Sequence, residues 1–229
     1  MRLTERRNDT DTPRVEEQDW SGLERFGGVA LVAAAILGIV ILGMLLPLAG
    51  GLPSDAEHLL DKAASRAWLI HLVAVLYVLL DLCLVGALPA LYVALRSVNR
   101  TWPLVAGLVA AVALMADINS GLWVYALPDL GNASVAATTA ARAGYTASGQ
   151  LLYSYIYGSE TRFYVSLLSL AVSIFSLTML RGEFNRGVAY LGILLGLAGV
   201  VLGLIGFIPV VVLLSLWFLP TGIKLYRLG

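Results

Sequence analysis

Two aspartates lie near the middle of long apolar runs, where a carboxylate could do chemistry that it cannot do in water. Asp81 lies in the run Ala67–Leu95, which also holds His71 near its start, and Asp117 lies in the next run. The hydrocarbon of a bilayer offers a carboxylate neither water nor dielectric screening, and the penalty is roughly 2.5–3.5 kcal/mol. Acids at that depth are therefore candidates for helix–helix hydrogen bonds, proton relays or cation sites.

The helical wheel places further polar side chains beside each aspartate. With about 100° per residue, an arc of roughly 120° on the first run holds four of them: His71, Tyr77, Asp81 and Tyr92. On the second run, Asp117 and Ser120 share one side with the small residues Ala106, Ala110, Ala113 and Gly121. We expect these two faces to meet, so that the interior of a helix bundle holds two carboxylates, an imidazole and two phenols.

Three roles for the aspartates remain open. Lys and Arg are missing from the depth of every apolar run, so neither aspartate has an obvious ion-pair partner. Each one, protonated by desolvation, could donate a hydrogen bond that holds helices together. Asp81 or Asp117 could instead share a proton with His71 or with the other carboxylate, or the pair could line a water-filled path for a cation. We favour the first role.

Other chemistries find less support in the sequence. The chain has only two histidines, His58 and His71, which excludes an intramembrane zinc hydrolase with three histidine ligands and more than one bis-histidine haem. Asp55, Glu57, His58 and Asp61 could in principle bind a divalent ion, although a solvated helix face is the favoured interpretation. Nucleophile triads, phosphate loops and nucleotide motifs are not visible. We therefore predict neither an enzyme nor a bound cofactor or metal.

The composition indicates which elements carry these residues. The 229 residues are 59% hydrophobic and 13% charged, with a mean hydropathy of +0.84, whereas soluble proteins carry about 25% charged residues. The net charge is zero and a basic face is lacking, so nucleic acid is not expected as a partner. The single cysteine, Cys83, cannot form an internal disulfide. The expected partner of such a chain is the lipid bilayer, in which a membrane protein or a second copy could join it.

Six apolar runs predict an all-α, six-span membrane bundle. The spans are residues 26–46, 67–95, 103–127, 163–180, 187–206 and 210–226. Pro47 closes the first span, Pro89 kinks the second, and Phe207–Pro209 makes a tight turn before the last. Residues 1–25 form a polar tail, and the run after them is too long for a signal peptide, so we expect a retained first span.

Two longer segments separate the spans. Ser54 and Glu57 form a capping-box pattern, which predicts a short polar helix starting at Ser54. Residues 128–162 are predicted to be the longest loop, with a weakly helical first half. Its tyrosine-rich second half, which reaches Tyr164, indicates an interfacial belt. Alternatively, Tyr153, Tyr155 and Tyr157 form a surface for a partner.

The basic residues predict the orientation. With six spans and a cytoplasmic N-terminus, eleven basic residues lie inside: Arg2, Arg6, Arg7, Arg14, Arg25, Arg96, Arg100, Arg181, Arg186, Lys224 and Arg227. Only Lys62, Arg66, Arg142 and Arg162 then lie outside. Cytoplasmic loops carry an excess of Lys and Arg, so both termini are expected in the cytoplasm.

Two stripes of small residues predict how the fourth and fifth spans pack. Ser166, Ser169, Ser173 and Ser176 follow a 3-4-3 spacing, and Gly192, Gly196, Gly199, Gly203 and Gly206 follow a 4-3-4-3 spacing. Small residues let helix backbones approach closely in lipid. We expect an antiparallel hairpin with the serines against the glycines, in preference to a polar groove lined by the serines.

Three segments resemble a family of uncharacterised bacterial six-span membrane proteins. They are SDAEHLLDKAASRAWLIHLV, ALYVALRSVNR and RGVAYLGILLGLAGVVLGL, about a third of the chain. The resemblance implies the fold and a bacterial cytoplasmic membrane, and it implies no activity. Our leading hypothesis is a non-enzymatic accessory or interaction subunit. The alternative is a small proton- or cation-coupled transporter or channel that uses Asp81 and Asp117.

Overall fold

The computed structural model describes residues 20–48, 55–206 and 210–229, and every regular element among these residues is a helix. The α-helices are α1 (Ser21–Leu48), α2 (Ala56–Ser65), α3 (Ala67–Leu95), α4 (Thr101–Ala136), α5 (Thr139–Ser154), α6 (Glu160–Met179), α7 (Arg186–Leu204) and α8 (Val210–Leu228). A π-helical turn, Tyr155–Ser159, joins α5 to α6. The described residues include five helices long and apolar enough to cross a membrane, within α1, α3, α4, α6 and α7. This is the architecture of a multi-pass membrane protein.

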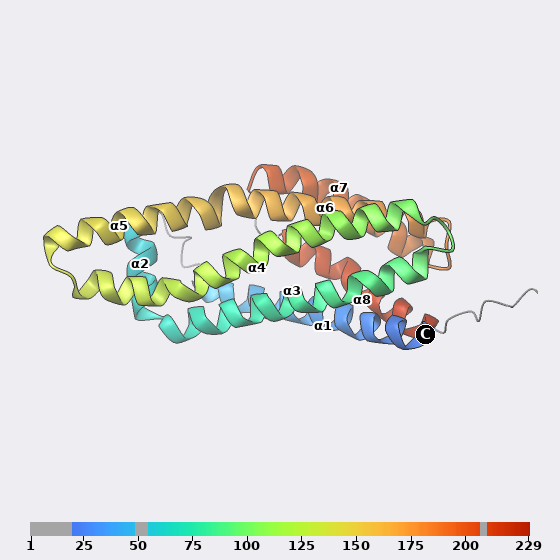
Figure 1. Cartoon of the computed structure of the whole chain (residues 1–229), viewed down its shortest axis with the longest axis horizontal. Coiled ribbons are helices and arrows are strands. Elements are labelled where there is room, and N and C mark those ends of the chain that lie inside the picture. Colours follow the sequence, from blue (N-terminus) through green and yellow to red (C-terminus); the bar gives the residue numbers. More distant parts are fainter. Residues whose placement is uncertain (1–19, 49–54, 207–209) are drawn as a thin grey trace, which may run out of the picture.

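The long helices form a closed antiparallel bundle. Going round it, α1 packs on α3, α3 on α4, α4 on α6, α6 on α7, α7 on α8 and α8 on α1. Residues 96–100 and 181–185 make short turns at one end of the bundle, where the C-terminus also lies (Figure 1). We call this the short-loop end. The opposite end carries α2, α5 and the last turns of α4, and we call it the arm end.

Two helical segments replace the predicted loop over residues 128–162, so the prediction of helix in its first half is confirmed and the prediction of a long loop is wrong. Helix α4 continues through Pro128 to Ala136, and α5 follows after two residues. Alanine, the best helix former, is frequent here and favours the helical state. Packing also contributes, because α2 covers the face of α4 that carries the buried residues Leu127, Pro128, Gly131 and Ser134. We define the arm as residues 128–154.

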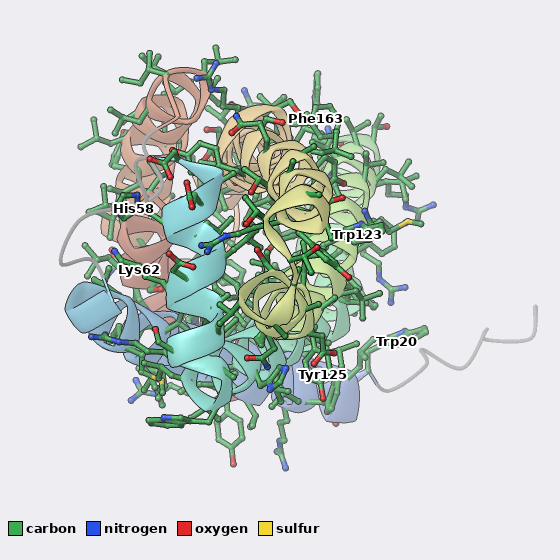
Figure 2. The ribbon with its side chains drawn as sticks, turned by 90° about the vertical axis from the view of Figure 1, so that its left-hand side faces the viewer. Trp20, His58, Lys62, Trp123, Tyr125 and Phe163 are labelled. Atoms are coloured by element: carbon green, nitrogen blue, oxygen red, sulfur yellow. The ribbon has the colours of Figure 1, made fainter. Side chains whose placement is uncertain are left out.

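Helix α2 lies across the arm end (Figure 2) and holds the arm against the bundle. Its N-cap is Asp55, whose side chain accepts a 2.9 Å hydrogen bond from the His58 amide. Asp55 thus does the capping predicted for Ser54, which lies outside the described residues. The buried face of α2 consists of Ala56, Leu59, Leu60 and Ala63. A Cβ added at Gly131 would lie 2.5 Å from the Leu60 carbonyl oxygen, so α2 and α4 touch backbone to backbone.

The prolines do not break the helices in which they lie. Pro89 lies inside α3, and α1 runs through Pro47 to Leu48 although we expected Pro47 to close that span. Neighbouring helices and local adjustment compensate a proline in such helices. Helix α7 ends where Gly206 takes a positive φ of 81°. The tight turn predicted at residues 207–209 lies outside the described residues.

Candidate functional site

Asp81, Asp117 and Tyr77 gather where α3, α4 and α6 meet, and a fourth polar side chain, Tyr164, joins them from α6. Asp81 is 1% exposed and Tyr164 is 2% exposed. The phenol of Tyr164 interacts electrostatically with Asp117, Asp81 and Tyr77. Three helices therefore contribute to one group of two carboxyls and two phenols, of which Asp81 and Tyr164 are buried and Asp117 and Tyr77 half-buried. We call these four residues the acid cluster.

Tyr164 is the member that the sequence analysis missed, because it was assigned to the tyrosine-rich loop. A wheel of α6 contains the signal that finds it. Tyr164 shares a face with Leu168, Ala171 and Phe175, which follow at helical spacing and are all buried. The serine stripe occupies the opposite face of α6. A tyrosine on the apolar face of a membrane helix thus pointed to a polar partner inside the bundle.

His71 and Tyr92, which were expected beside the aspartates, lie outside the acid cluster. His71 precedes Asp81 by ten residues, a rise of about 15 Å along α3, and Tyr92 follows it by eleven. The His71 ring instead packs against the ring of Tyr125 on α4, with ring centroids 4.6 Å apart and the ring planes tilted by 37°. Direct proton sharing between His71 and Asp81 is therefore ruled out in this arrangement.

An apolar layer covers the acid cluster on the side of the short-loop end. Three buried leucines form this layer, each about one helical turn from a member of the acid cluster. Leu84 follows Asp81 on α3, Leu114 precedes Asp117 on α4, and Leu168 follows Tyr164 on α6. They line a cavity of about 20 Å³, room for about one water. Its other lining residues are also apolar, with Phe175, Trp217 and Phe218 farther along. A cavity without polar groups does not retain water.

On the side of the arm end, polar side chains continue beyond the cluster. Ser120 follows Asp117 by one turn of α4 and is buried. Next to it, the Asn119 amide donates a 2.8 Å hydrogen bond to the Tyr155 hydroxyl in the π-helical turn. The polar environment of the acids is thus one-sided.

The tyrosines predicted to form a partner surface are used within the chain. Tyr155 accepts the hydrogen bond from Asn119. Tyr153 packs on a second, smaller core made by Leu59, Ala63 and Leu127. The side chain of Tyr157 lies outside the described residues. Tyr153 thus packs the arm against α2 and α4, and Tyr155, directly after the arm, binds α4.

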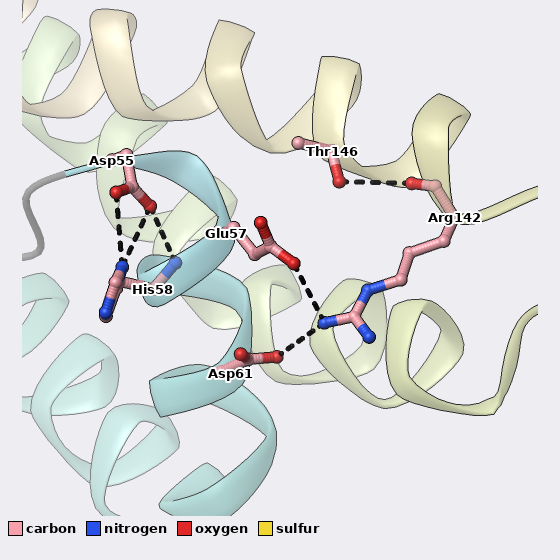
Figure 3. A network of polar contacts seen from close by, with 6 residues as sticks. All are labelled: Asp55, Glu57, His58, Asp61, Arg142 and Thr146. Carbon is pink, nitrogen blue, oxygen red and sulfur yellow. Dashed lines mark hydrogen bonds and ion pairs between the residues drawn. The ribbon is translucent and has the colours of Figure 1, made fainter. Parts of the chain in front are cut away.

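An arginine connects α5 with the acidic face of α2 (Figure 3). Nη2 of Arg142 lies 3.3 Å from Oε1 of Glu57 and 3.3 Å from Oδ1 of Asp61. His58 Nδ1 lies 3.1 Å from Oδ1 of Asp55 on the same helix. The guanidinium thus contacts two of the carboxylates considered for a divalent ion. Within the described ranges, Asp, Glu, His and Cys form no group of three placed to hold a metal.

The serine and glycine stripes meet between α6 and α7. A Cβ added to Gly192, Gly196, Gly199 or Gly203 would meet Oγ of Ser176, Ser173, Ser169 or Ser166, in that order. At Gly196 it would also lie 2.7 Å from the Ser169 carbonyl oxygen, so the backbones themselves touch. We call this contact the serine–glycine seam. It leaves no groove between the two helices at these four positions.

Comparison with known proteins adds nothing to this geometry, since no family model, curated protein or solved structure matches the chain. The resemblance to uncharacterised bacterial proteins stays a prediction.

Proposed function

We propose that α8 is a sixth span and that the short-loop end faces the cytoplasm of a bacterium. Helix α8 has 19 residues, about 28 Å, close to the thickness of the hydrocarbon. Close contacts join α8 to α1 along the middle of α8, for example Gly222 to Gly28 and Ser215 to Gly38. A helix paired in this way with a membrane-spanning partner fits a span better than a surface segment.

The charges support the orientation. Among the described residues the short-loop end carries seven basic side chains: Arg25, Arg96, Arg100, Arg181, Arg186, Lys224 and Arg227. The arm end carries four: Lys62, Arg66, Arg142 and Arg162. The positive-inside rule then assigns the short-loop end to the cytoplasm and the arm to the extracytoplasmic side.

Within this frame the chain acts as a non-enzymatic membrane protein, an accessory or interaction subunit whose acid cluster ties α3, α4 and α6 together. The observation that carries this proposal is the layer of Leu84, Leu114 and Leu168 beside the cluster. An ion or proton moving between the acids and the short-loop end would have to cross this layer without polar contacts. A polar group held between helices is instead a familiar device for fixing their register.

The test is a proton-flux and cation-flux assay in proteoliposomes. Wild type is compared with Asp81→Asn and Asp117→Asn, and the matched control is Asp129→Asn on the exposed side of α4. We expect no flux above that of empty liposomes for any of the four proteins. The proposal would be overturned if wild type and Asp129→Asn both showed flux and if Asp81→Asn or Asp117→Asn abolished it. A proton- or cation-coupled transporter would then take its place, with access to the acids from the polar arm side.

A further inference from the structure

The two turns at the short-loop end share one chemical pattern. The first reads Leu95-Arg-Ser-Val-Asn-Arg100, and the second reads Leu180-Arg-Gly-Glu-Phe-Asn-Arg186. In both, the asparagine caps the outgoing helix. Asn99 accepts hydrogen bonds from the amides of Thr101 and Trp102, and Asn185 accepts one from the amide of Gly187. An arginine thus stands at both ends of each of these two segments, and the side chains of Arg100 and Arg186 take no part in the capping hydrogen bonds.

The two turns also touch. A Cβ added at Gly182 would lie 3.1 Å from Cγ2 of Val98 and 3.9 Å from Cδ2 of Leu95. Figure 1 shows the two turns together at one end of the bundle. Their four arginines, Arg96, Arg100, Arg181 and Arg186, therefore belong to one surface, which we call the arginine turns. Glu183 is the only acid in these two turns, so the net charge of the surface is 4 − 1 = +3.

Three of these arginines are available for a ligand. Arg96 lies over the Trp20 ring, 5.1 Å from its centroid. Arg100, Arg181 and Arg186 are exposed and form no ion pair with the described parts of the chain. The arm end differs, because Arg142 is bound there by two carboxylates. Exposed guanidinium groups bind phosphate oxygens readily, often in a bidentate manner.

Next to the arginine turns lie exposed apolar and aromatic side chains. Trp102 is 56% exposed, two residues after Arg100, and Tyr190 is 62% exposed, one turn after Arg186. Farther into the bundle the exposed faces of α4 and α7 carry Leu104, Leu108, Leu194 and Leu197. The arginines can bind the anionic headgroup of a phospholipid, and the apolar surface beneath them can contact its acyl chains.

We propose that the arginine turns bind the headgroup of an anionic phospholipid in the cytoplasmic leaflet. The phosphodiester lies between Arg100 of the first turn and Arg181 and Arg186 of the second, and the acyl chains lie along α4 and α7. Binding therefore bridges the α3–α4 hairpin and the α6–α7 hairpin, which the acid cluster joins deeper in the membrane.

The experiment titrates purified full-length protein in detergent with phosphatidylglycerol or phosphatidylcholine and counts bound lipid by native mass spectrometry. The test variant is Arg100→Gln/Arg181→Gln/Arg186→Gln. The matched control, Arg25→Gln/Lys224→Gln/Arg227→Gln, removes the same charge from the same end outside the two turns. Each basic residue near a surface contributes about 1 kcal/mol to attraction of anionic lipid, so we expect the test variant to bind phosphatidylglycerol at least roughly tenfold more weakly. The control is expected to change by no more than about threefold, and phosphatidylcholine to bind weakly to all three proteins.

Equal losses in the two triple variants, or no loss in the test variant, would overturn the proposal. Displacement of phosphatidylglycerol by an equal concentration of inorganic phosphate would also overturn it, because the surface would then bind free phosphate. If the test variant does not fold, the single variants Arg100→Gln and Arg181→Gln replace it. Each is expected to weaken binding about threefold, and unchanged binding in both would contradict the proposal.

Discussion

Helix α6 takes part in two contacts of opposite character. On one face, its serines meet the glycines of α7, and the two backbones approach until a single added methyl group would overlap. On the other face, Tyr164 meets the carboxyls of α3 and α4 through polar side chains. The serine–glycine seam joins two helices along four successive contacts, whereas the acid cluster joins three helices at one level.

The difference shows that polar residues serve two purposes in one membrane helix. In the seam, Oγ of Ser169 and of Ser176 is buried and has no hydrogen-bond partner among the described residues. Ser173 donates to the Ser169 carbonyl of its own helix, at 3.1 Å. Only Ser166 reaches across, donating to the Val200 carbonyl at 3.4 Å. These serines act mainly through their small size, while the acid cluster acts through the electrostatic interaction of its carboxyl and phenol groups.

The largest effect is expected from a methyl group in the seam. Gly196→Ala would place a Cβ 2.7 Å from the Ser169 carbonyl oxygen and 2.9 Å from the Ser173 amide nitrogen, so α6 and α7 must separate. Overpacking of this kind costs about 1–3 kcal/mol, and we expect a lower melting temperature in detergent. The control is Gly107→Ala on α4, where nothing lies within 4 Å of the added Cβ. Equal melting temperatures for the two variants would show that the seam is looser than described.

A double-mutant cycle tests the acid cluster. Tyr164→Phe and Asp117→Asn each remove one partner, and interhelical hydrogen bonds in membranes average about 0.6 kcal/mol with a maximum near 1.7. We expect each single variant to lose stability in this range and the double variant to lose less than the sum. Unfolding in mixed micelles measures all four proteins. Additive losses would mean that the two side chains do not interact energetically.

The ion pairs of Arg142 give a smaller, salt-dependent effect. Its side chain is 37% exposed, so Arg142→Gln should cost at most about 1 kcal/mol. The loss should appear as faster hydrogen exchange in α2 and α5, with the membrane helices unchanged, and should shrink in high salt because exposed charges are screened. Arg100→Gln, which removes an arginine without an ion pair to the described residues, is the control. Faster exchange in the bundle itself would contradict the local role of Arg142.

The smallest effect is expected from the loss of a serine hydroxyl in the serine–glycine seam. Ser176→Ala removes a buried hydroxyl without a hydrogen-bond partner in the described part of the chain, and it keeps the size of the side chain nearly constant. We expect the melting temperature to change little, by the equivalent of at most about 0.5 kcal/mol. A large loss would mean that the serine hydroxyls bond across the seam, and the contrast with the acid cluster would then disappear.

Local periodicity explains what could be predicted. The spacing of the glycines from Gly192 onward and of the serines up to Ser176 specifies one face on each helix. A six-residue link makes the two helices antiparallel neighbours, so these faces can pack against each other. The wheel of α4 likewise placed Asp117 on a side with small residues. Such predictions need only the geometry of single helices and a short connection.

What could not be predicted depends on contacts between distant segments. The arm is helical partly because α2, more than sixty residues earlier, covers Gly131 and Leu127. Tyr164 was grouped with the tyrosines of the loop although the predicted span, residues 163–180, contained it, because its polar partners belong to α3 and α4. His71 was placed with Asp81 because a wheel shows direction around a helix and hides the distance along it.

The pairing of α1 with α8 has a consequence for biosynthesis. Gly28 packs against Gly222, and the last residue, Gly229, packs against Ser21, so the first and last described helices are neighbours. Residues 49–209, about 160 residues, are translated between them, which takes roughly 8–32 s at ordinary elongation rates. During that interval α1 has been synthesised, but the face with Gly28 and Gly38 has no contact with α8. Closure of the ring therefore cannot precede the synthesis of α8, and a ribosome that stalls before α8 leaves an open bundle.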